Sequence, residues 1–403
     1  MLSKIAVVCL ILGCVAARVM AQEGIYVAQG DTLRYTYTPA PAQPQPEPRP
    51  PFLRRVVNYF EKSTVDRTFE KKIDFTFAGG PSYSKNTSFG IGLLAAGLYR
   101  LDRTDSVTPP SNVSIFANVS VSGFYAVGVD GNNIFSHDRN RIDYTAMFSS
   151  APRDLWGIGY DDGRYNAHSS YTEKHYLIKG RYLHRVLPNT FVGALLSFEH
   201  TQGKKFDERS ESYLGLAGQK HHYTATGIGL LAEYDSRDFI PNPFRGFYFS
   251  FQETLFPKGL GNCAKSLWRT VFTANYYRKV WKGGVVATDL YAEFNSDGTP
   301  WPMLARMGGS KRMRGYYQGQ YTDNGLVTFQ VELRQRIWRR IGCTVWGGAG
   351  NVFPRLADFD WSETLPNYGI GFRWELKKRV NVRIDYGFGK KTSGFLFNIN
   401  EAF

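Results

Sequence analysis

From about residue 71 to the last residue, apolar and polar side chains alternate with a period of two over long stretches. In residues 380–388 the even positions are Val, Val, Ile, Tyr and Phe, whereas the odd positions are Asn, Arg, Asp and Gly. Residues 326–337 and 368–376 alternate in the same way, with Arg and Glu on the polar face. Because successive side chains of a β-strand point to opposite faces, such strands need an apolar medium on one side and water on the other.

A soluble β-sandwich could supply both environments with its apolar faces turned inward, but its strands average about five or six residues. The strands here are nearer to about ten residues, the length that crosses a bilayer at a tilt. Aromatic residues make up 15% of the 403 residues, and there are 41 Gly, which is a strand and turn composition. We therefore predict an all-β protein, a transmembrane antiparallel β-barrel.

The alternation predicts about sixteen strands, an even number as in closed bacterial barrels. They cover residues 71–83, 87–101, 111–121, 123–135, 139–150, 172–187, 189–202, 222–236, 243–256, 266–281, 283–295, 325–338, 341–353, 366–378, 380–389 and 393–403. The gaps after the fifth, seventh, eleventh and thirteenth strands are long (151–171, 203–221, 296–324 and 354–365), whereas most gaps after even strands are short. Long outer loops and short periplasmic turns are typical of outer-membrane barrels; the gap at 102–110 is an exception.

Three segments are predicted along the chain. An apolar run at 5–17 follows Lys4 and ends in Val19-Met20-Ala21, which predicts a signal peptide over 1–21; Cys14 leaves a lipoprotein signal as the alternative. Residues 22–70 form a Pro-rich periplasmic leader, in which 52–63 is either a short amphipathic helix or a plain linker. The barrel occupies 71–403, and Cys263 and Cys343 are expected near opposite ends of it, too far apart for a disulfide.

The net charge of +14 raises the question of a nucleic-acid partner. A nucleic-acid-binding protein would gather its basic residues on one face, whereas here they cluster in short turns at 278–279, 339–340 and 377–379. Such clusters are typical of strand ends at a membrane surface or its anionic lipids, and a purely solvating role is compatible with them as well. We predict outer-membrane lipids as partners and no nucleic acid.

Residues 295–324 are too many, and too rich in Gly and charge, to form a tight turn. A long loop in a compact fold is usually functional or disordered. At its tip, Arg314-Gly315-Tyr316 combines a Gly that permits a sharp backbone path, an Arg that seeks a carboxylate and a Tyr that seeks a packing surface. We predict that this loop folds back into the barrel lumen, where Arg314 meets an acid on the inner wall; a solvated surface loop is the alternative.

Three motifs in this order, followed by a terminal Phe, resemble the BamA/TamA-like outer-membrane insertase superfamily of bacterial surface antigen barrels. The first motif is Arg314-Gly315-Tyr316. The second lies in the turn between the eighth and ninth strands and comprises Asp235, Arg237, Asp238, Pro243, Arg245 and Gly246. The third lies in the thirteenth strand and comprises Trp346, Gly347, Gly348 and Gly350. The last strand, with Phe397, Ile399 and Phe403, is similar to the C-terminal assembly signal of such barrels, from which Glu401 departs.

The resemblance implies acidic partners for Arg314 on the twelfth and thirteenth strands. Glu332 matches the first of these, and the alternation places it inward. Gly348 stands where the resemblance leads us to expect Asp, so one partner is missing and the loop should be anchored more weakly. The alternative is that Glu332 pairs with a neighbouring Arg instead, at position 334, 336 or 383. The second motif is expected to shape its turn rather than to contact a client protein.

The family insertases carry polypeptide-transport-associated domains before the barrel, and the segment before residue 71 is too short for one, so we expect a barrel-only member. Family members work at the seam between the first and last strands. In the first strand, Gly79-Gly80-Pro81 weakens pairing because Pro lacks a ladder donor. We predict that strands 71–83 and 393–403 form a lateral gate; the alternative is that these three residues end the first strand early.

These expectations define the predicted function. The resemblance implies that the protein assists the insertion of outer-membrane proteins or the translocation of polypeptides in the outer membrane of a Gram-negative bacterium. It also implies unfolded outer-membrane proteins and other assembly-machinery subunits as partners. The alternative is a structural or partner-binding barrel without insertase activity.

The seven His residues show no nucleophile or metal-ligand spacing, so we predict no enzyme activity, no metal and no cofactor. A passive porin would have its pore plugged by the infolded loop.

Overall fold

The computed structural model describes residues 55, 58–59, 67–105, 108–240, 242–377 and 379–403. The predicted signal peptide, most of the predicted leader and nine of the twelve residues of the predicted helix at 52–63 lie outside these residues. Within them, no helix combines the length and apolarity that a membrane crossing requires.

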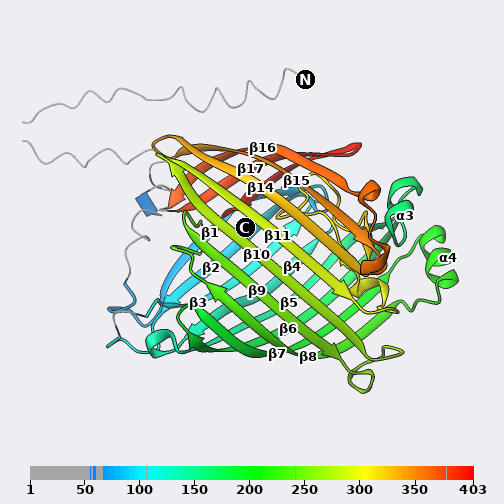
Figure 1. Ribbon diagram of the computed structural model, residues 1–403, viewed down its shortest axis with the longest axis horizontal. Helices are drawn as coiled ribbons and strands as arrows, with labels where there is room; N and C mark the ends of the chain where they lie inside the picture. The colour runs from blue at the N-terminus through cyan, green and yellow to red at the C-terminus, as the bar shows by residue number, and fades with distance from the viewer. Residues whose placement is uncertain (1–54, 56–57, 60–66, 106–107, 241, 378) are drawn as a thin grey trace, which may run out of the picture. The chain divides into compact units, whose positions relative to one another are not determined.

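Sixteen antiparallel strands close into one barrel (Figure 1). They are β1 (Asp74–Ser84), β2 (Ser88–Tyr99), β3 (Ser111–Ser120), β4 (Tyr125–Ile134), β5 (Asn140–Leu155), β6 (Ser169–Leu187), β7 (Thr190–Lys204), β8 (His222–Asp235), β9 (Gly246–Phe256), β10 (Leu267–Trp281), β11 (Gly284–Asn295), β14 (Gly325–Trp338), β15 (Ile341–Phe353), β16 (Leu365–Lys377), β17 (Val380–Gly389) and β18 (Thr392–Ile399). Each corresponds to one predicted strand, so the predicted fold class is confirmed. β12 (Ala305–Arg306) and β13 (Thr322–Asp323) form a separate two-stranded sheet.

The short helices lie in the connections. They are α3 (Tyr160–Tyr165), α4 (Glu208–Leu216), and the 3-10 helices η1 (Ser136–Asp138), η2 (Lys258–Leu260), η3 (Trp301–Met303), η4 (Leu356–Asp358) and η5 (Trp361–Glu363). In Figure 1, α3 and α4 lie together at the right end of the barrel, where the long connections after β5 and β7 emerge. We call this the long-loop end and the opposite end the short-turn end.

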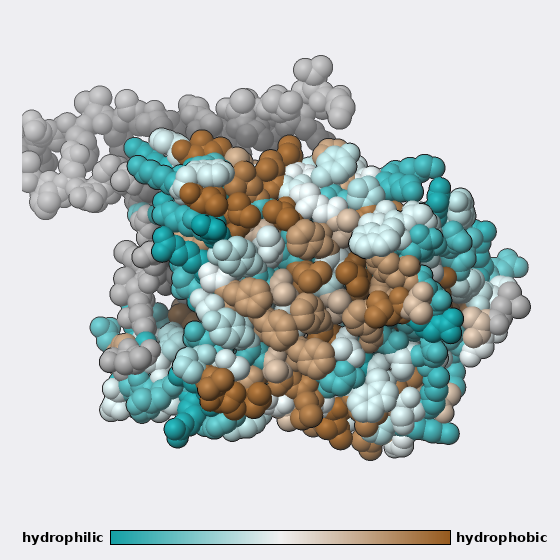
Figure 2. Space-filling model, viewed as in Figure 1, coloured by the Kyte–Doolittle hydropathy of each residue, from teal (hydrophilic) through white to brown (hydrophobic). Residues whose placement is uncertain are grey.

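The strands alternate between an outer apolar face and an inner polar face. On β1, for example, exposed and half-buried residues alternate along the whole strand, and Phe77, Leu93 and Leu230 are among the exposed large apolar side chains. Figure 2 shows apolar side chains over the middle of the wall, with hydrophilic side chains towards both ends. Buried polar residues such as Asp289, Glu332 and Asp385 face the lumen, which is the arrangement that a barrel in a bilayer requires.

The last strand is shorter than predicted. The prediction extended it over 393–403, whereas β18 ends at Ile399. Asn400 has a φ of +70°, and Glu401 and Ala402 after it are buried. The Glu401 carboxylate accepts hydrogen bonds from Arg373 Nε (2.8 Å) and Asn381 Nδ2 (2.6 Å). The chain end therefore leaves the wall and turns inward, because the Glu401 carboxylate finds cationic partners inside the barrel.

Candidate functional site

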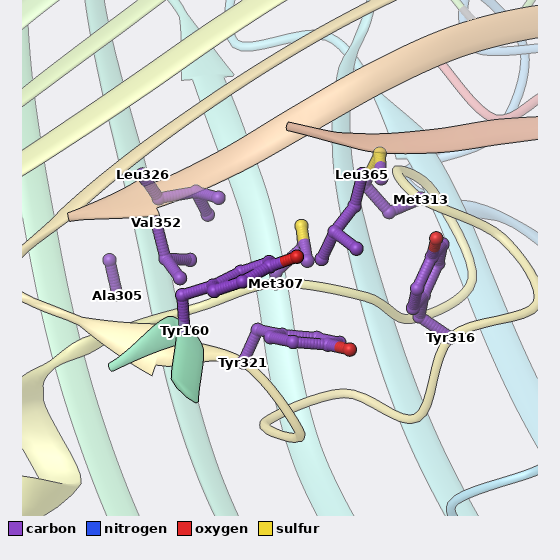
Figure 3. Packing of buried hydrophobic residues seen from close by; sticks show 9 residues of the cluster. All are labelled: Tyr160, Ala305, Met307, Met313, Tyr316, Tyr321, Leu326, Val352 and Leu365. Atoms are coloured by element: carbon purple, nitrogen blue, oxygen red, sulfur yellow. The ribbon is translucent and has the colours of Figure 1, made fainter. Parts of the chain in front are cut away.

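Residues 296–324, which we call the lumen loop, connect β11 to β14 and pack inside the barrel. Figure 3 shows its apolar core, to which the loop contributes Ala305, Met307, Met313, Tyr316 and Tyr321. The wall contributes Leu326, Val352 and Leu365, and α3 contributes Tyr160. All nine are buried, so the loop is held by apolar packing as well as by charge. The predicted infolding is present, and the alternative of a solvated surface loop is wrong.

Arg314 lies at the centre of the loop's contacts with the wall and is 0% exposed. Its Nη2 donates to Glu332 Oε2 of β14 (2.6 Å), and its Nη1 donates to Asp385 Oδ2 of β17 (2.8 Å). The guanidinium also lies 3.6 Å from the ring centroid of Trp346 on β15, a cation–π contact. The predicted pair with Glu332 is therefore present. Arg334 pairs with Glu332 as well (2.7 Å), in addition to Arg314 and not instead of it.

The expectation that one acidic partner of Arg314 is missing is wrong, because Asp385 supplies a second carboxylate. At Gly348, an added Cβ would lie 2.4 Å from the carbonyl oxygen of Phe329 and 2.7 Å from Gln330 Cβ, so this position has no room for Asp. Asp385 accepts from Nη1 of Arg314, whereas Glu332 accepts from Nη2. The Asp385 side chain is itself fully buried. Its carboxylate also pairs with Arg373 (2.6 Å) and Arg383 (3.2 Å). Arg314 is thus held by two buried carboxylates.

Sequence reasoning missed two further anchors of the lumen loop. Arg312 makes a two-point pair with Asp289 of β11 (2.7 and 2.8 Å) and lies over the Tyr291 ring. Arg306 makes a two-point pair with Glu173 of β6 (3.1 and 2.7 Å), which also accepts from Arg153. The signal was present in the sequence, since Glu173 and Asp289 are acids at inward positions of apolar strands. The backbone path of the lumen loop, which brings each Arg to its acid, could not be predicted from the sequence.

Glycines in the wall make room for the loop tip. Gly315 has a φ of +106°, and an added Cβ there would lie 2.5 Å from the carbonyl oxygen of Gly387. An added Cβ at Gly389 would lie 2.2 Å from the Tyr316 ring. The Tyr316 hydroxyl donates to the Pro366 carbonyl (2.8 Å) and accepts from the Lys390 N–H (2.7 Å). The tip therefore lies flat on β16 and β17.

The third motif supplies the surface under the loop. The Arg314 guanidinium lies over the Trp346 ring, and the Nε1 of Trp346 donates to Asn367 Oδ1 (3.0 Å). An added Cβ at Gly350 would lie 2.9 Å from Met307 Sδ and 3.0 Å from Met313 Sδ, so this Gly admits the loop methionines. Gly347 faces outward, with no atom within 4 Å of an added Cβ. Of this motif, Trp346 and Gly350 adjoin the lumen loop, whereas Gly347 faces outward and Gly348 lies against β14.

The turn motif shapes the connection between β8 and β9 at the short-turn end. Arg237 makes a two-point pair with Asp235 (2.9 and 2.8 Å), and an added Cβ at Gly246 would lie 2.3 Å from the Ser236 carbonyl oxygen. Asp238 accepts from the N–H groups of Phe244 and Arg245. Pro243 is buried and the Arg245 side chain is exposed.

Asp238 also reaches a second hairpin. Arg379, in the β16–β17 turn, donates to both Asp238 oxygens (3.0 and 2.9 Å) and to the Asn242 carbonyl. Its guanidinium lies 4.0 Å from the Phe244 ring centroid. Because β9 and β16 are separated by four strands in the barrel order, these contacts tie two distant parts of the rim together. No local pattern in the sequence predicts this contact between Arg379 and Asp238.

The seam between β1 and β18 is the least paired junction of the barrel. Only Tyr83 and Phe397 are register partners across it, whereas β1 pairs with β2 along its whole length from Asp74 to Ser84. Gly79, Gly80 and Pro81 pair with Leu93, Gly92 and Ile91 of β2. They therefore do not end the strand early, and that alternative is wrong.

Residues 74–80 of β1 have no register partner in β18, because the chain turns inward after Ile399. Along this edge the Phe77 N–H donates to the Tyr59 hydroxyl (2.8 Å). Backbone groups of alternate residues point to the same edge of a strand, so Pro81 removes a donor on the side of the seam. Of the predicted C-terminal residues, Phe397 and Ile399 belong to β18. Phe403 lies beyond the strand, and its carbonyl accepts from Arg334 (2.9 Å).

The lumen loop bridges the two hairpins beside the seam at the long-loop end. In the β1–β2 turn, Asn86 Nδ2 donates to the Gln318 carbonyl (3.1 Å), and the Gln318 N–H donates to Asn86 Oδ1 (3.0 Å). At the start of β18, Thr392 Oγ1 donates to the Gly315 carbonyl (3.0 Å). Lys85 Nζ donates to the same hydroxyl across the seam. The seam is thus held at one end by four side-chain hydrogen bonds and left with little pairing towards the other.

Other candidate chemistry is not assembled in the part of the chain that the structure describes. Cys263 and Cys343 are free thiols. No group of three or more His, Cys, Asp or Glu side chains in the described residues could hold a metal ion.

Fold and site together define a class: a sixteen-stranded outer-membrane β-barrel whose lumen holds a long loop through an Arg-Gly-Tyr tip. The family model described as the Omp85 superfamily domain matches residues 130–403, and the chain belongs to this superfamily. The predicted kinship with BamA-like barrels is confirmed.

Solved structures agree in fold. BamA from Haemophilus ducreyi lacking POTRA domains 1-3 is similar at 13% identity and a TM-score of 0.55, with 81% of this chain and 70% of that chain covered. CdiB from Escherichia coli gives 12% identity and a TM-score of 0.55, with coverage of 95% and 68%. CdiB from Acinetobacter baumannii gives 9% identity and a TM-score of 0.54, with coverage of 82% and 60%. No curated protein matches the chain.

Proposed function

We propose that this barrel inserts outer-membrane proteins or translocates polypeptides through the seam between β1 and β18, without covalent chemistry and without a cofactor. The observation that carries the proposal is the single register pair across that seam. Membership of the Omp85 superfamily supports insertion or translocation in general. The proposed setting is the outer membrane of a Gram-negative bacterium, with residues 1–21 as a signal peptide and 22–70 as a periplasmic leader.

The edge of β1 can act as a template for an incoming strand. An unpaired edge presents a row of N–H and C=O groups, and an extended segment can add to it as a further strand. Residues 74–80 provide such an edge, at the end of the seam away from Asn86 and Gln318. A membrane-crossing strand of about ten residues is longer than this edge, so it must separate Tyr83 from Phe397 to pair with the rest of β1. Phe75 and Phe77 project outward from it, so a strand added there would face lipid with its own apolar residues. Tyr59 is the group that an incoming strand would displace.

A disulfide across the seam tests the proposal. The variant carries Tyr83→Cys and Phe397→Cys in a background of Cys263→Ser and Cys343→Ser. The control places Ile91→Cys and Val119→Cys, which are register partners on the outer face of β2 and β3. The readout is the folding rate of an unfolded client barrel into vesicles that contain the protein.

We expect oxidation of the seam variant to lower the folding rate to that of empty vesicles, and reduction to restore it, while the control is unaffected by either. A seam-locked protein that still accelerates client folding as well as its reduced form would exclude the lateral route.

A specific observation favours a second candidate, a structural or partner-binding barrel without insertase activity. Three arginines of the lumen loop, Arg306, Arg312 and Arg314, are paired to buried carboxylates, which resists movement of the loop. For this candidate, the reduced protein would not accelerate client folding, and its partners would be other subunits of an assembly complex. The same vesicle assay therefore separates the two.

A further inference from the structure

Two neighbouring hairpins at the short-turn end carry a dense cluster of cations. They are the β10–β11 and β14–β15 turns, which lie side by side because β11 pairs with β14 from Gly284 and Gln335 onward. Their exposed basic residues are Arg278, Lys279, Lys282, Arg336 and Arg339. We call these five residues the basic rim. In Figure 1 the two hairpins lie at the end of the barrel opposite α3 and α4.

The basic rim is not neutralised by the protein itself. In the described part of the chain, no carboxylate lies within 4.0 Å of the charged nitrogens of Arg278, Lys279, Lys282 or Arg339, and Arg336 reaches Glu375 only at 3.9 Å. On another arc of the same end, Arg141 and Arg185 both pair closely with Asp138 (2.6 and 2.7 Å). Like charges placed together without acids raise the local potential and attract anions. The rim is therefore an unsatisfied cationic surface.

Large apolar side chains adjoin the rim on the outer wall. Trp281 is 53%, Ile337 64% and Trp338 60% exposed. Trp281 Nε1 donates to Gln335 Oε1 (2.6 Å), and the Arg339 guanidinium lies 4.8 Å from the Trp338 ring centroid. Figure 2 shows hydrophilic side chains along the left end of the barrel directly beside apolar ones. Trp is favoured at the boundary between acyl chains and headgroups, so the rim lies at headgroup level.

We propose that the basic rim binds the phosphate groups of anionic glycerophospholipids in the periplasm-facing leaflet. Short turns of outer-membrane barrels face the periplasm, which places the rim in that leaflet. The apolar neighbours decide between a lipid and an acidic peptide, because Trp281, Ile337 and Trp338 present a surface for acyl chains that a soluble peptide would leave exposed. Lys282 and Arg339 at the two turn tips provide the outermost contacts. The proposal does not depend on whether the seam opens.

Lipid retention by the purified full chain tests this inference. The patch variant combines Lys279→Gln, Lys282→Gln and Arg339→Gln. The matched control removes the same charge from exposed lysines at the long-loop end, by Lys204→Gln, Lys205→Gln and Lys258→Gln. Each protein is extracted from vesicles with equal amounts of phosphatidylglycerol and phosphatidylcholine, and native mass spectrometry counts the lipids that remain bound. Folding is checked by the heat-dependent shift in gel mobility.

We expect the unmodified protein and the control to retain phosphatidylglycerol in preference to phosphatidylcholine. In the patch variant, the ratio of retained phosphatidylglycerol to retained phosphatidylcholine should be about tenfold lower. Lys282→Gln alone, at an exposed turn position, should lose part of it and serves if the triple variant does not fold. Equal retention of the two lipids by the unmodified protein, or equal losses in patch variant and control, would overturn the proposal. Displacement of the bound lipid by an octaglutamate peptide, with affinity lost in the patch variant, would assign the surface to a protein partner instead.

Discussion

At the scale of single residues, the site depends on how a buried cation is balanced. Arg314 is fully buried between Glu332 and Asp385, and removing one member of a buried pair leaves an uncompensated charge that costs about 3–5 kcal/mol. Glu332 could be predicted from the sequence because a motif and the alternation both pointed to it. Asp385 could not, because it lies on β17, two strands beyond the strand where the second acid was expected. Only the curvature of the wall brings it to the same guanidinium.

Asp385→Asn should therefore destabilise the protein almost as much as Glu332→Gln. We expect each to lower the free energy of unfolding by about 3–5 kcal/mol, measured by urea titration in detergent micelles. In combination with Arg314→Met, each loss should shrink, since the cation that needed the acid has gone. The control is Asp358→Asn at the exposed pair with Arg355, where the side chains are 37% and 66% accessible. This control should lower the free energy of unfolding by no more than about 1 kcal/mol. A loss at Asp385 as small as that at Asp358 would show that Asp385 is not needed to compensate the charge of Arg314.

The buried carboxyl of Asp323 predicts a pH response of the lumen loop. Asp323 in β13 is 4% exposed, and burial raises its pKa to about 6, against the Asn324 N–H bond that lowers it, with Glu363 and Asp358 raising it further. A carboxyl whose folded pKa is raised stabilises the fold below its unfolded pKa of about 3.9, and this contribution is lost as pH rises through about 6.

We expect amide exchange in residues 305–323, corrected for the intrinsic effect of pH, to show stronger protection at pH 5 than at pH 7.5. Asp323→Asn, which cannot ionise, should remove the difference. If the variant keeps the same pH dependence as the unmodified protein, another group is responsible.

At the scale of elements, every strand of the wall could be predicted from the sequence, but not the residue at which the last strand ends. Period-two alternation is a local signal, and β14, β16 and β17 follow it closely because one face meets lipid and the other water. The odd-numbered apolar pattern is interrupted only at Glu401 before it ends in Phe403. β18 nevertheless stops at Ile399, because Glu401 pairs with Arg373 inside the barrel. The same limit applies to Arg306 and Arg312. Their acids sit on predicted strands, but a loop path is set by packing that no local pattern encodes.

The contact between Asn86 and Gln318 joins two elements that the sequence places far apart. Its two hydrogen bonds fasten the β1–β2 turn to the lumen loop beside the seam, and each contributes about 1 kcal/mol. Asn86→Ala should therefore speed amide exchange in β18 and in residues 81–84 by about tenfold. Asn86→Asp keeps the acceptor and should give a smaller effect. Unchanged exchange in the Ala variant would show that Thr392 and Lys85 hold this end of the seam without it.

At the scale of the whole molecule, the question is whether the barrel conducts. A sixteen-stranded barrel is wide enough to enclose water, but here the lumen loop enters from the long-loop end and the β8–β9 turn is tied to Arg379 at the other. A cavity of about 390 Å³ lies beside the loop, lined by Tyr291, Arg306 and Arg312 among others. Ions would have to pass between paired charges, which is unfavourable unless the loop moves.

We therefore expect the unmodified protein to show only small or erratic conductance in planar bilayers. Replacing residues 308–319 with a short Gly-Ser linker removes Arg312, Arg314 and Tyr316 together and should raise the conductance severalfold. Shortening residues 356–363, in the connection between β15 and β16, deletes a comparable length and should leave the conductance low. If the first variant conducts no better than the second, the obstruction is the β8–β9 turn and not the loop. Arg379→Ala, which releases that turn from the opposite rim, would then be the change that opens the lumen.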